Sequence, residues 1–145
     1  MTRLALTLTF AAVAATIWGP MPPAVEVDRP TFLAAIAARE SHSEPGAIGL
    51  AGERSAYQFT AATWRFHTDA PFELATFDAE LAHWVAEQHF EQLKKELRNR
   101  RVPVRPETLA AAWNKGSAKA RRYYRSAYAK QVANLYWDAL SRRTA

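Results

Sequence analysis

Apolar residues recur with the 3.6-residue period of an α-helix along most of the chain, and proline or glycine interrupts the pattern between segments. One such segment runs from about Pro30 to Ser43, with Asp28 as the expected N-cap and Pro30 in the first turn. Its apolar stripe consists of Phe32, Leu33, Ile36 and Ala37. The next position on that stripe is Glu40. A carboxylate there either turns out to water at the helix end or is held on the buried face for a functional reason.

The same periodicity predicts four further helices. They are TAATWRFH, capped by Thr60, and the ranges 77–98, 106–116 and 117–143, the last capped by Ser117. The expected stripe of 77–98 is Phe77, Leu81, Trp84, Val85, Gln88 and Gln92/Leu93, and that of 117–143 is Tyr124, Tyr128, Gln131/Val132, Leu135 and Ala139. The tryptophans 64, 84, 113 and 137 are expected mostly in the core.

The segment EPGAIGLAGERSAYQF, residues 44–59, is rich in glycine and small residues and predicts a loop with short β-pairing near residues 57–59. The predicted fold is therefore mainly α. We expect a single helical domain over residues 28–145, with the glycine-rich loop or a small β element lining a cleft.

The N-terminus has the pattern of a secretory signal peptide. Arg3 precedes the apolar run LALTLTFAAVAATIW, which is short for a bilayer-spanning helix, and small residues around Val13-Ala14-Ala15 offer a cleavage site. The proline-rich GPMPPAVEVDRP follows as a spacer. We expect residues 1–27 to be signal peptide and spacer, with a secreted or periplasmic protein that has no stable membrane insertion afterwards. An uncleaved anchor or a buried helix is the alternative.

Charge is distributed unevenly along the chain, whose net charge is +5. From Arg98 onward, the chain has twelve Lys and Arg residues but only two acidic residues, Glu107 and Asp138. Four of these basic residues, Lys119, Arg121, Arg122 and Arg125, are expected to face solvent. If the chain is exported, an anionic cell wall is the favoured partner of this surface, and nucleic acid is not expected.

No metal site is expected from the residue types present. The chain has no cysteine, which excludes disulfides and thiolate metal sites. Its four histidines, at positions 42, 67, 83 and 89, do not have metal-ligand spacing.

Four polar residues are out of place in a plain helical bundle: Glu40, Glu53 and Gln58 in the glycine-rich loop, and Asn114 at the end of an Ala- and Trp-rich helix. If the fold gathers them, they line a cleft between the first helix, the loop and the last two helices. Burial disfavours the charged form of a carboxyl group and raises its pKa. A raised pKa is what a general acid requires near neutral pH.

The motifs RESH, GERSAYQF, AAWNKG and YAKQVANLY, in this order, resemble the lysozyme-like superfamily over roughly residues 32–140. They are most similar to lytic transglycosylases of the soluble type and to goose-type lysozymes. The resemblance implies that Glu40 is the catalytic acid, that the substrate is the peptidoglycan glycan strand, and that no cofactor is needed. The substrate-binding residues it implies, together with neighbours in the same motifs, are Ser41, Tyr57, Gln58, Trp113, Asn114 and Tyr128.

The chain departs from the family pattern at several positions. Trp113 replaces the usual tyrosine, Lys115 replaces a small residue, and the family's Gly-Leu-Met-Gln segment is matched only loosely by residues 56–59. These departures put the substrate preference in doubt more than the reaction.

Glu53 is the second carboxylate candidate, because Gly52-Glu53-Arg54 resembles the Gly-Asp-Arg loop of goose-type lysozymes. In one interpretation Glu53 positions an attacking water or stabilises positive charge at the sugar. In the other it caps the loop or forms an ion pair with Arg54 or another arginine. Three functions follow: a lytic transglycosylase that forms a 1,6-anhydro product, a muramidase that uses water, or a non-catalytic wall-binding module. A basic helical nucleic-acid binder is a further alternative, which requires that the N-terminal segment is not a signal peptide. The sequence leaves the oligomeric state unknown.

Overall fold

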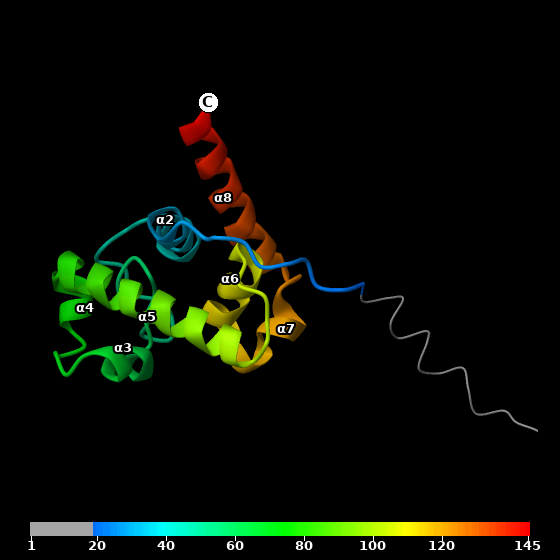
Figure 1. The fold of residues 1–145 in the computed structure, drawn as a ribbon. Helices are drawn as coiled ribbons and strands as arrows, with labels where there is room; N and C mark the ends of the chain where they lie inside the picture. Colours follow the sequence, from blue (N-terminus) through cyan, green and yellow to red (C-terminus); the bar gives the residue numbers. More distant parts are fainter. Residues whose placement is uncertain (1–18) are drawn as a thin grey trace, which may run out of the picture.

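A computed structural model of the chain describes residues 19–145, so most of the predicted signal peptide lies outside the described residues. The domain is helical, as Figure 1 shows. Its elements in chain order are α2 (Arg29–Ser41), α3 (Ala61–His67), α4 (Leu74–Phe77), α5 (Ala79–Asn99), α6 (Pro106–Lys115), the 3-10 turn η1 (Ser117–Lys119), α7 (Ala120–Tyr123) and α8 (Ala127–Thr144). The predicted mainly α class is confirmed.

Side-chain caps fix where the principal helices begin. Asp28 accepts a hydrogen bond from the Thr31 amide at 2.9 Å, and Thr60 accepts one from the Thr63 amide at 3.2 Å. These satisfy amides that have no partner within the helix. The predicted caps of the first helix and of TAATWRFH are thus confirmed, as is the helix that runs from Pro106 to the glycine at position 116.

The prediction of one helix over 77–98 was wrong at its start. Asp78 has extended backbone and caps α5 through the Leu81 amide, so Phe77 belongs to the separate turn α4. The buried face also differs from the predicted stripe, because Phe77 is 80% exposed and Trp84 is 44% exposed. The residues of α5 that are buried are Ala82, Val85, Ala86, Phe90, Leu93 and Leu97.

The prediction of one helix over 117–143 was also wrong. Ser117 opens only the 3-10 turn and forms no side-chain cap there, while Ser126 has extended backbone and caps α8 through the Ala129 amide. The predicted helix is therefore interrupted between the end of α7 at Tyr123 and the start of α8 at Ala127. On α8, Val132 is buried as predicted, but Leu135 is 40% exposed and Tyr136 takes its place in the core.

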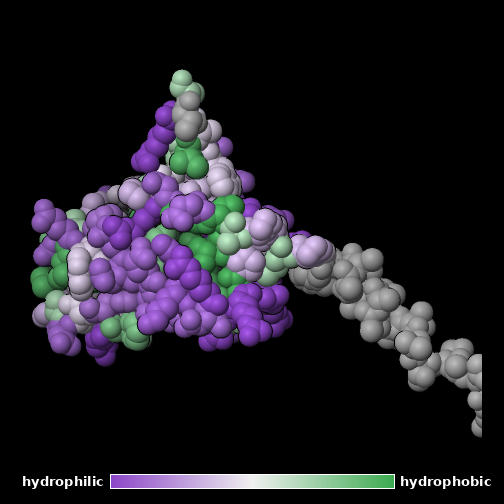
Figure 2. Space-filling model, viewed as in Figure 1, coloured by the Kyte–Doolittle hydropathy of each residue, from purple (hydrophilic) through white to green (hydrophobic). Residues whose placement is uncertain are grey.

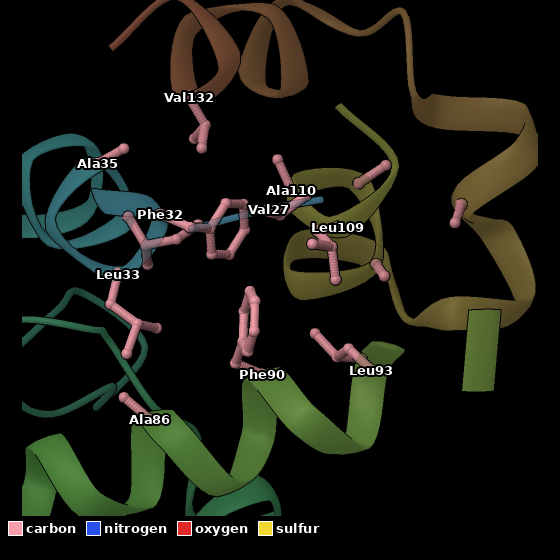
Figure 3. Close-up of a cluster of buried hydrophobic side chains, with 14 of the residues drawn as sticks. Val27, Phe32, Leu33, Ala35, Ala86, Phe90, Leu93, Leu109, Ala110 and Val132 are labelled. Carbon is pink, nitrogen blue, oxygen red and sulfur yellow. The ribbon is translucent and has the colours of Figure 1, made fainter. Parts of the chain in front are cut away.

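The core lies where α2, α5, α6 and α8 meet, as Figure 3 shows. Phe32 of α2 and Phe90 of α5 face each other with ring centroids 5.5 Å apart, and Leu109 of α6 and Val132 of α8 complete the contact. The alanines of α6 allow α8 to approach closely. This core holds the C-terminal end of α2 beside α8, which determines where Glu40 lies.

The glycine-rich segment 44–59 forms a loop with two isolated antiparallel bridges, Ile48 to Arg54 and Arg54 to Phe59. The predicted short β-pairing is confirmed in this minimal form.

Figure 2 shows that the outward side of α5 is largely hydrophilic, while Figure 1 shows the end of α8 projecting from the domain. Across residues 19–145, no helix combines the length and apolar character needed to cross a membrane.

Candidate active site

The C-terminal end of α2 places Glu40 beside the glycine-rich loop. The helix stops abruptly because His42 and Ser43 adopt left-handed backbone, with φ of 55° and 65°. The Ser41 hydroxyl donates to the Ala56 carbonyl at 2.8 Å, which ties the helix end to the loop. The loop therefore covers a helix terminus that would otherwise project into water, and Glu40 is partly buried.

A cleft of about 400 Å³ opens between this helix end, the loop, α3 and the end of α6. Its lining residues are Glu40, Gly49, Leu50, Ala51, Glu53, Gln58, Phe59, Thr60, Thr63, His89, Trp113 and Asn114. The structure thus brings together Glu40, Glu53, Gln58, Trp113 and Asn114, which come from three parts of the sequence. Their joint placement agrees with the predicted cleft.

Within residues 19–145, the Glu40 carboxyl group has one direct side-chain hydrogen-bond partner. The Tyr128 hydroxyl donates to Glu40 Oε1 at 2.5 Å, so α8 contacts the carboxyl group although none of its residues lines the cleft. Burial raises the pKa of Glu40 above its ordinary value and the charge of Glu53 adds to this, while the Tyr128 hydrogen bond and Arg39 oppose it. The net effect is a raised pKa of Glu40, so a larger fraction of its carboxyl group is protonated at a given pH.

Gly49 allows the two loop side chains to converge. A Cβ atom at this position would overlap the Glu53 carboxylate and the Gln58 amide oxygen, so only glycine leaves room for both. Gln58 has left-handed backbone, with φ of 52°, and its amide nitrogen donates to the Ser55 carbonyl at 2.9 Å. Such backbone is unfavourable for a residue other than glycine and is concentrated at functional sites.

Glu53 caps a backbone amide of the loop and also lines the cleft. Its carboxylate accepts a hydrogen bond from the Ala51 amide at 3.1 Å, and it pairs with no arginine of residues 19–145. Arg54 instead lies over the Phe72 ring, with Cζ 5.3 Å from the centroid. The arginine pairing considered for Glu53 is therefore not formed, while the loop-cap role is.

The floor of the cleft is aromatic. The Trp113 ring lies 4.7 Å from the His89 ring and 5.9 Å from the Phe59 ring, measured between centroids. Burial, reinforced by the nearby His67, lowers the pKa of His89 to about 4, so His89 is uncharged at neutral pH. The sequence analysis considered His89 only as a metal ligand and missed its place here, because no local pattern reveals which core residue closes a cleft.

A model of the Transglycosylase SLT domain family matches residues 25–136. The chain belongs to this family. Family membership supports peptidoglycan cleavage of the lytic transglycosylase type, and the helical architecture is that of a lysozyme-like domain. No curated protein matches the chain significantly.

Three predicted substrate-binding residues of this SLT domain, Ser41, Tyr57 and Tyr128, lie beside the cleft and do not line it. Tyr128 contacts the Glu40 carboxyl group, as described above. Ser41 uses its hydroxyl to hold the loop, as described above. The Tyr57 hydroxyl lies 2.7 Å from His83 Nδ1, and its ring lies 6.4 Å from the Trp113 ring. All three residues therefore support the lining, and direct contact with substrate stays a prediction.

The SLT domain shows no grouping of three or more His, Asp or Glu side chains suited to a metal ion within the described part of the chain. Two of the histidines contact each other, with His67 Nε2 3.1 Å from His89 Nδ1. This contact joins two rings of lowered pKa, and the His89 ring also contacts the Trp113 ring in a T-shaped arrangement.

Proposed function

We propose that this SLT domain cleaves the β-1,4 bond between N-acetylmuramic acid and N-acetylglucosamine, with Glu40 as general acid and then general base. One observation carries the proposal: Glu40 is partly buried in a polar cleft, with its pKa raised and its carboxyl group oriented by Tyr128. A solvated carboxylate at a helix end would have none of these properties.

The reaction requires Glu40 to lose and regain one proton. The protonated carboxyl donates to the glycosidic oxygen, and the C1–O bond breaks with its electron pair moving to that oxygen while positive charge develops at C1. The 6-hydroxyl oxygen of the muramic residue then bonds to C1, and its proton passes to the Glu40 carboxylate. The products are a free 4-hydroxyl and a 1,6-anhydro ring, and no water is consumed.

Glu53 supports a second candidate outcome because its carboxylate lines the same cleft as Glu40 and its charge acts on Glu40. In that outcome a water placed by Glu53 attacks C1, as in a muramidase. Mass spectrometry of the products from purified peptidoglycan tests the proposal. Anhydromuropeptides support the transglycosylase, reducing ends indicate the muramidase, and the absence of products indicates a wall-binding module.

Gln58 and Asn114 are proposed to hold the sugar and not to transfer protons. Asn114 is exposed at the end of α6 with no side-chain partner among residues 19–145, so its amide is available to a ligand. We expect Asn114→Ala and Gln58→Ala each to lower kcat/KM by up to roughly tenfold, the cost of about one hydrogen bond. The limb of the pH–rate profile that reports Glu40 should stay in place, and a shift like that caused by changing Glu40 itself would refute the assignment.

The basic surface formed by Lys119, Arg121, Arg122 and Arg125 is proposed to attract the anionic wall. All four side chains are exposed, as predicted. Attraction between exposed charges is screened over a Debye length of about 8 Å at physiological salt. Co-sedimentation with insoluble peptidoglycan should therefore weaken steeply as NaCl is raised, and replacing all four residues with Gln should weaken it at low salt. Binding independent of salt, with unchanged thermal unfolding, would count against this role.

A further inference from the structure

Arg39 precedes Glu40 on α2, and its side chain reaches across to α8. Arg39 Nε donates to Gln131 Oε1 at 2.6 Å, and the guanidinium carbon lies 5.2 Å from the centroid of the Tyr128 ring. Tyr128 in turn donates its hydroxyl proton to Glu40. Arg39 therefore contacts the ring of the residue whose hydroxyl orients the proposed acid, and neither the motifs nor the cleft lining assigns it a role.

We propose that Arg39 is a positioning residue for Glu40: together with Gln131 it holds Tyr128 against the Glu40 carboxyl group, and it supplies the positive charge beside that group. The inference rests on the proposed function of Glu40. Arginine suits this task because its planar guanidinium can lie on an aromatic ring while one of its N–H groups donates to a fixed acceptor.

The charge of Arg39 matters because Glu40 must exist in two protonation states during one turnover. After donating its proton, Glu40 is an anion in a partly buried site, and that state is costly unless it is compensated. The Tyr128 hydrogen bond and the Arg39 charge both stabilise the anion and lower the pKa of Glu40, which limits the rise caused by burial. The carboxylate can then form and take back a proton within the same cycle.

The other groups around Glu40 do not supply this compensation. Glu53, from the loop, acts in the opposite sense and raises the pKa of Glu40. His89, from α5, lines the cleft but is uncharged at neutral pH. From α6, the cleft receives Trp113 and Asn114, which do not titrate. Among the described residues that line the cleft or act on Glu40, Arg39 is the one cation.

Arg39 can be changed without altering the cleft lining. It lies in an outer groove between α2 and α8, together with His42, Gln131 and Asn134, and is not part of the cleft that contains Glu40. A variant at Arg39 therefore tests an effect transmitted through Tyr128 and through the electric field, and not the loss of a substrate contact in the cleft.

The experiment follows the Glu40 carboxyl carbon by NMR during a pH titration of the full domain. We expect Arg39→Met to move the Glu40 midpoint to higher pH, because both the charge and the support of Tyr128 are lost. Gln131→Met should move it in the same direction by less, because the arginine charge remains. Arg98→Gln, which removes an exposed charge at the end of α5, is the matched control and should leave the midpoint unchanged.

Cleavage kinetics give the second readout. Arg39→Met should lower kcat by about tenfold with little change in KM, since misplacement of a reacting group affects the chemical step. The alkaline limb of its pH–rate profile should move upward with the NMR midpoint. Arg39→Lys, which keeps the charge but loses the planar group, should restore the midpoint more than it restores kcat.

An unchanged Glu40 midpoint in folded Arg39→Met would overturn the inference, whatever the cleavage assay shows. Conversely, wild-type protein that releases no product from peptidoglycan would overturn the proposed function, while the titration would still report whether Arg39 acts on Glu40. The two failures are therefore distinguishable.

Discussion

Glu40→Gln should lose cleavage of purified peptidoglycan almost completely while keeping its fold. Glutamine has nearly the same shape as glutamate and can still accept the Tyr128 hydrogen bond, but it has no proton to donate to the leaving oxygen. Loss of a general acid typically costs 10²–10⁴-fold in rate, so we expect a fall of at least roughly 10²-fold in kcat. The measurement is muropeptide release per unit time, with circular dichroism to verify the fold.

Glu53→Gln is the matched control, because it makes the same chemical change in the same cleft. A transglycosylase should retain most of its activity in this variant, since no water needs to be placed. A loss comparable to that of Glu40→Gln, together with reducing-end products in the wild type, would favour the muramidase. Substantial cleavage by Glu40→Gln, in a preparation shown to be free of wild-type enzyme, would contradict the role of Glu40.

The same Glu40→Gln variant should be at least as stable as the wild type at pH 7. Because folding raises the pKa of Glu40 above its ordinary 4.5, the folded state holds this proton more tightly than the unfolded state. The favourable contribution of Glu40 is fully present below about pH 4.5 and is lost as pH rises through the folded pKa. Chemical unfolding at pH 7 and pH 4 should show the advantage of the variant shrinking at the lower pH.

The sequence predicted which polar residues would gather in one cleft better than it predicted where the helices begin. The position of Glu40 on an apolar stripe was a local signal that a carboxylate faced inward, and the structure places that carboxylate partly buried in the cleft. The motifs also indicated Glu53, Gln58, Trp113 and Asn114, all of which line the cleft. Arg39 and His89 gave no such signal, because their places depend on how α8 and α5 pack against the site.

The helix errors have a common physical cause. Asp78 and Ser126 each favour the start of a new helix by capping it, and this local preference interrupted patterns that seemed continuous over 77–98 and 117–143. The new start at Asp78 separates Phe77 from α5, and Phe77 and Trp84 are solvent-exposed while Phe90 is buried. Size and apolar character therefore identified aromatic residues suited to a core, but not which of them the core would hold.

Trp64→Ala should cause the largest loss of stability among single tryptophan changes in the domain. The Trp64 side chain is fully buried, its indole N–H donates to the Ala70 carbonyl at 2.8 Å, and its ring packs against Phe59 and Phe72. Replacing a buried tryptophan by alanine costs roughly 3–5 kcal/mol, from lost burial and the cavity left behind. Urea unfolding followed by circular dichroism measures this loss.

Trp84→Ala is the control, because Trp84 is the same residue type on an amphipathic helix but is 44% exposed. We expect it to cost about 1 kcal/mol or less. Equal losses in the two variants would contradict the observed burial.

Because Phe59 packs between Trp64 and Trp113, a folded Trp64→Phe variant should also retain the cleft better than Trp64→Ala. The buried tryptophan thus supports the aromatic floor of the cleft, and its removal should reduce cleavage along with stability.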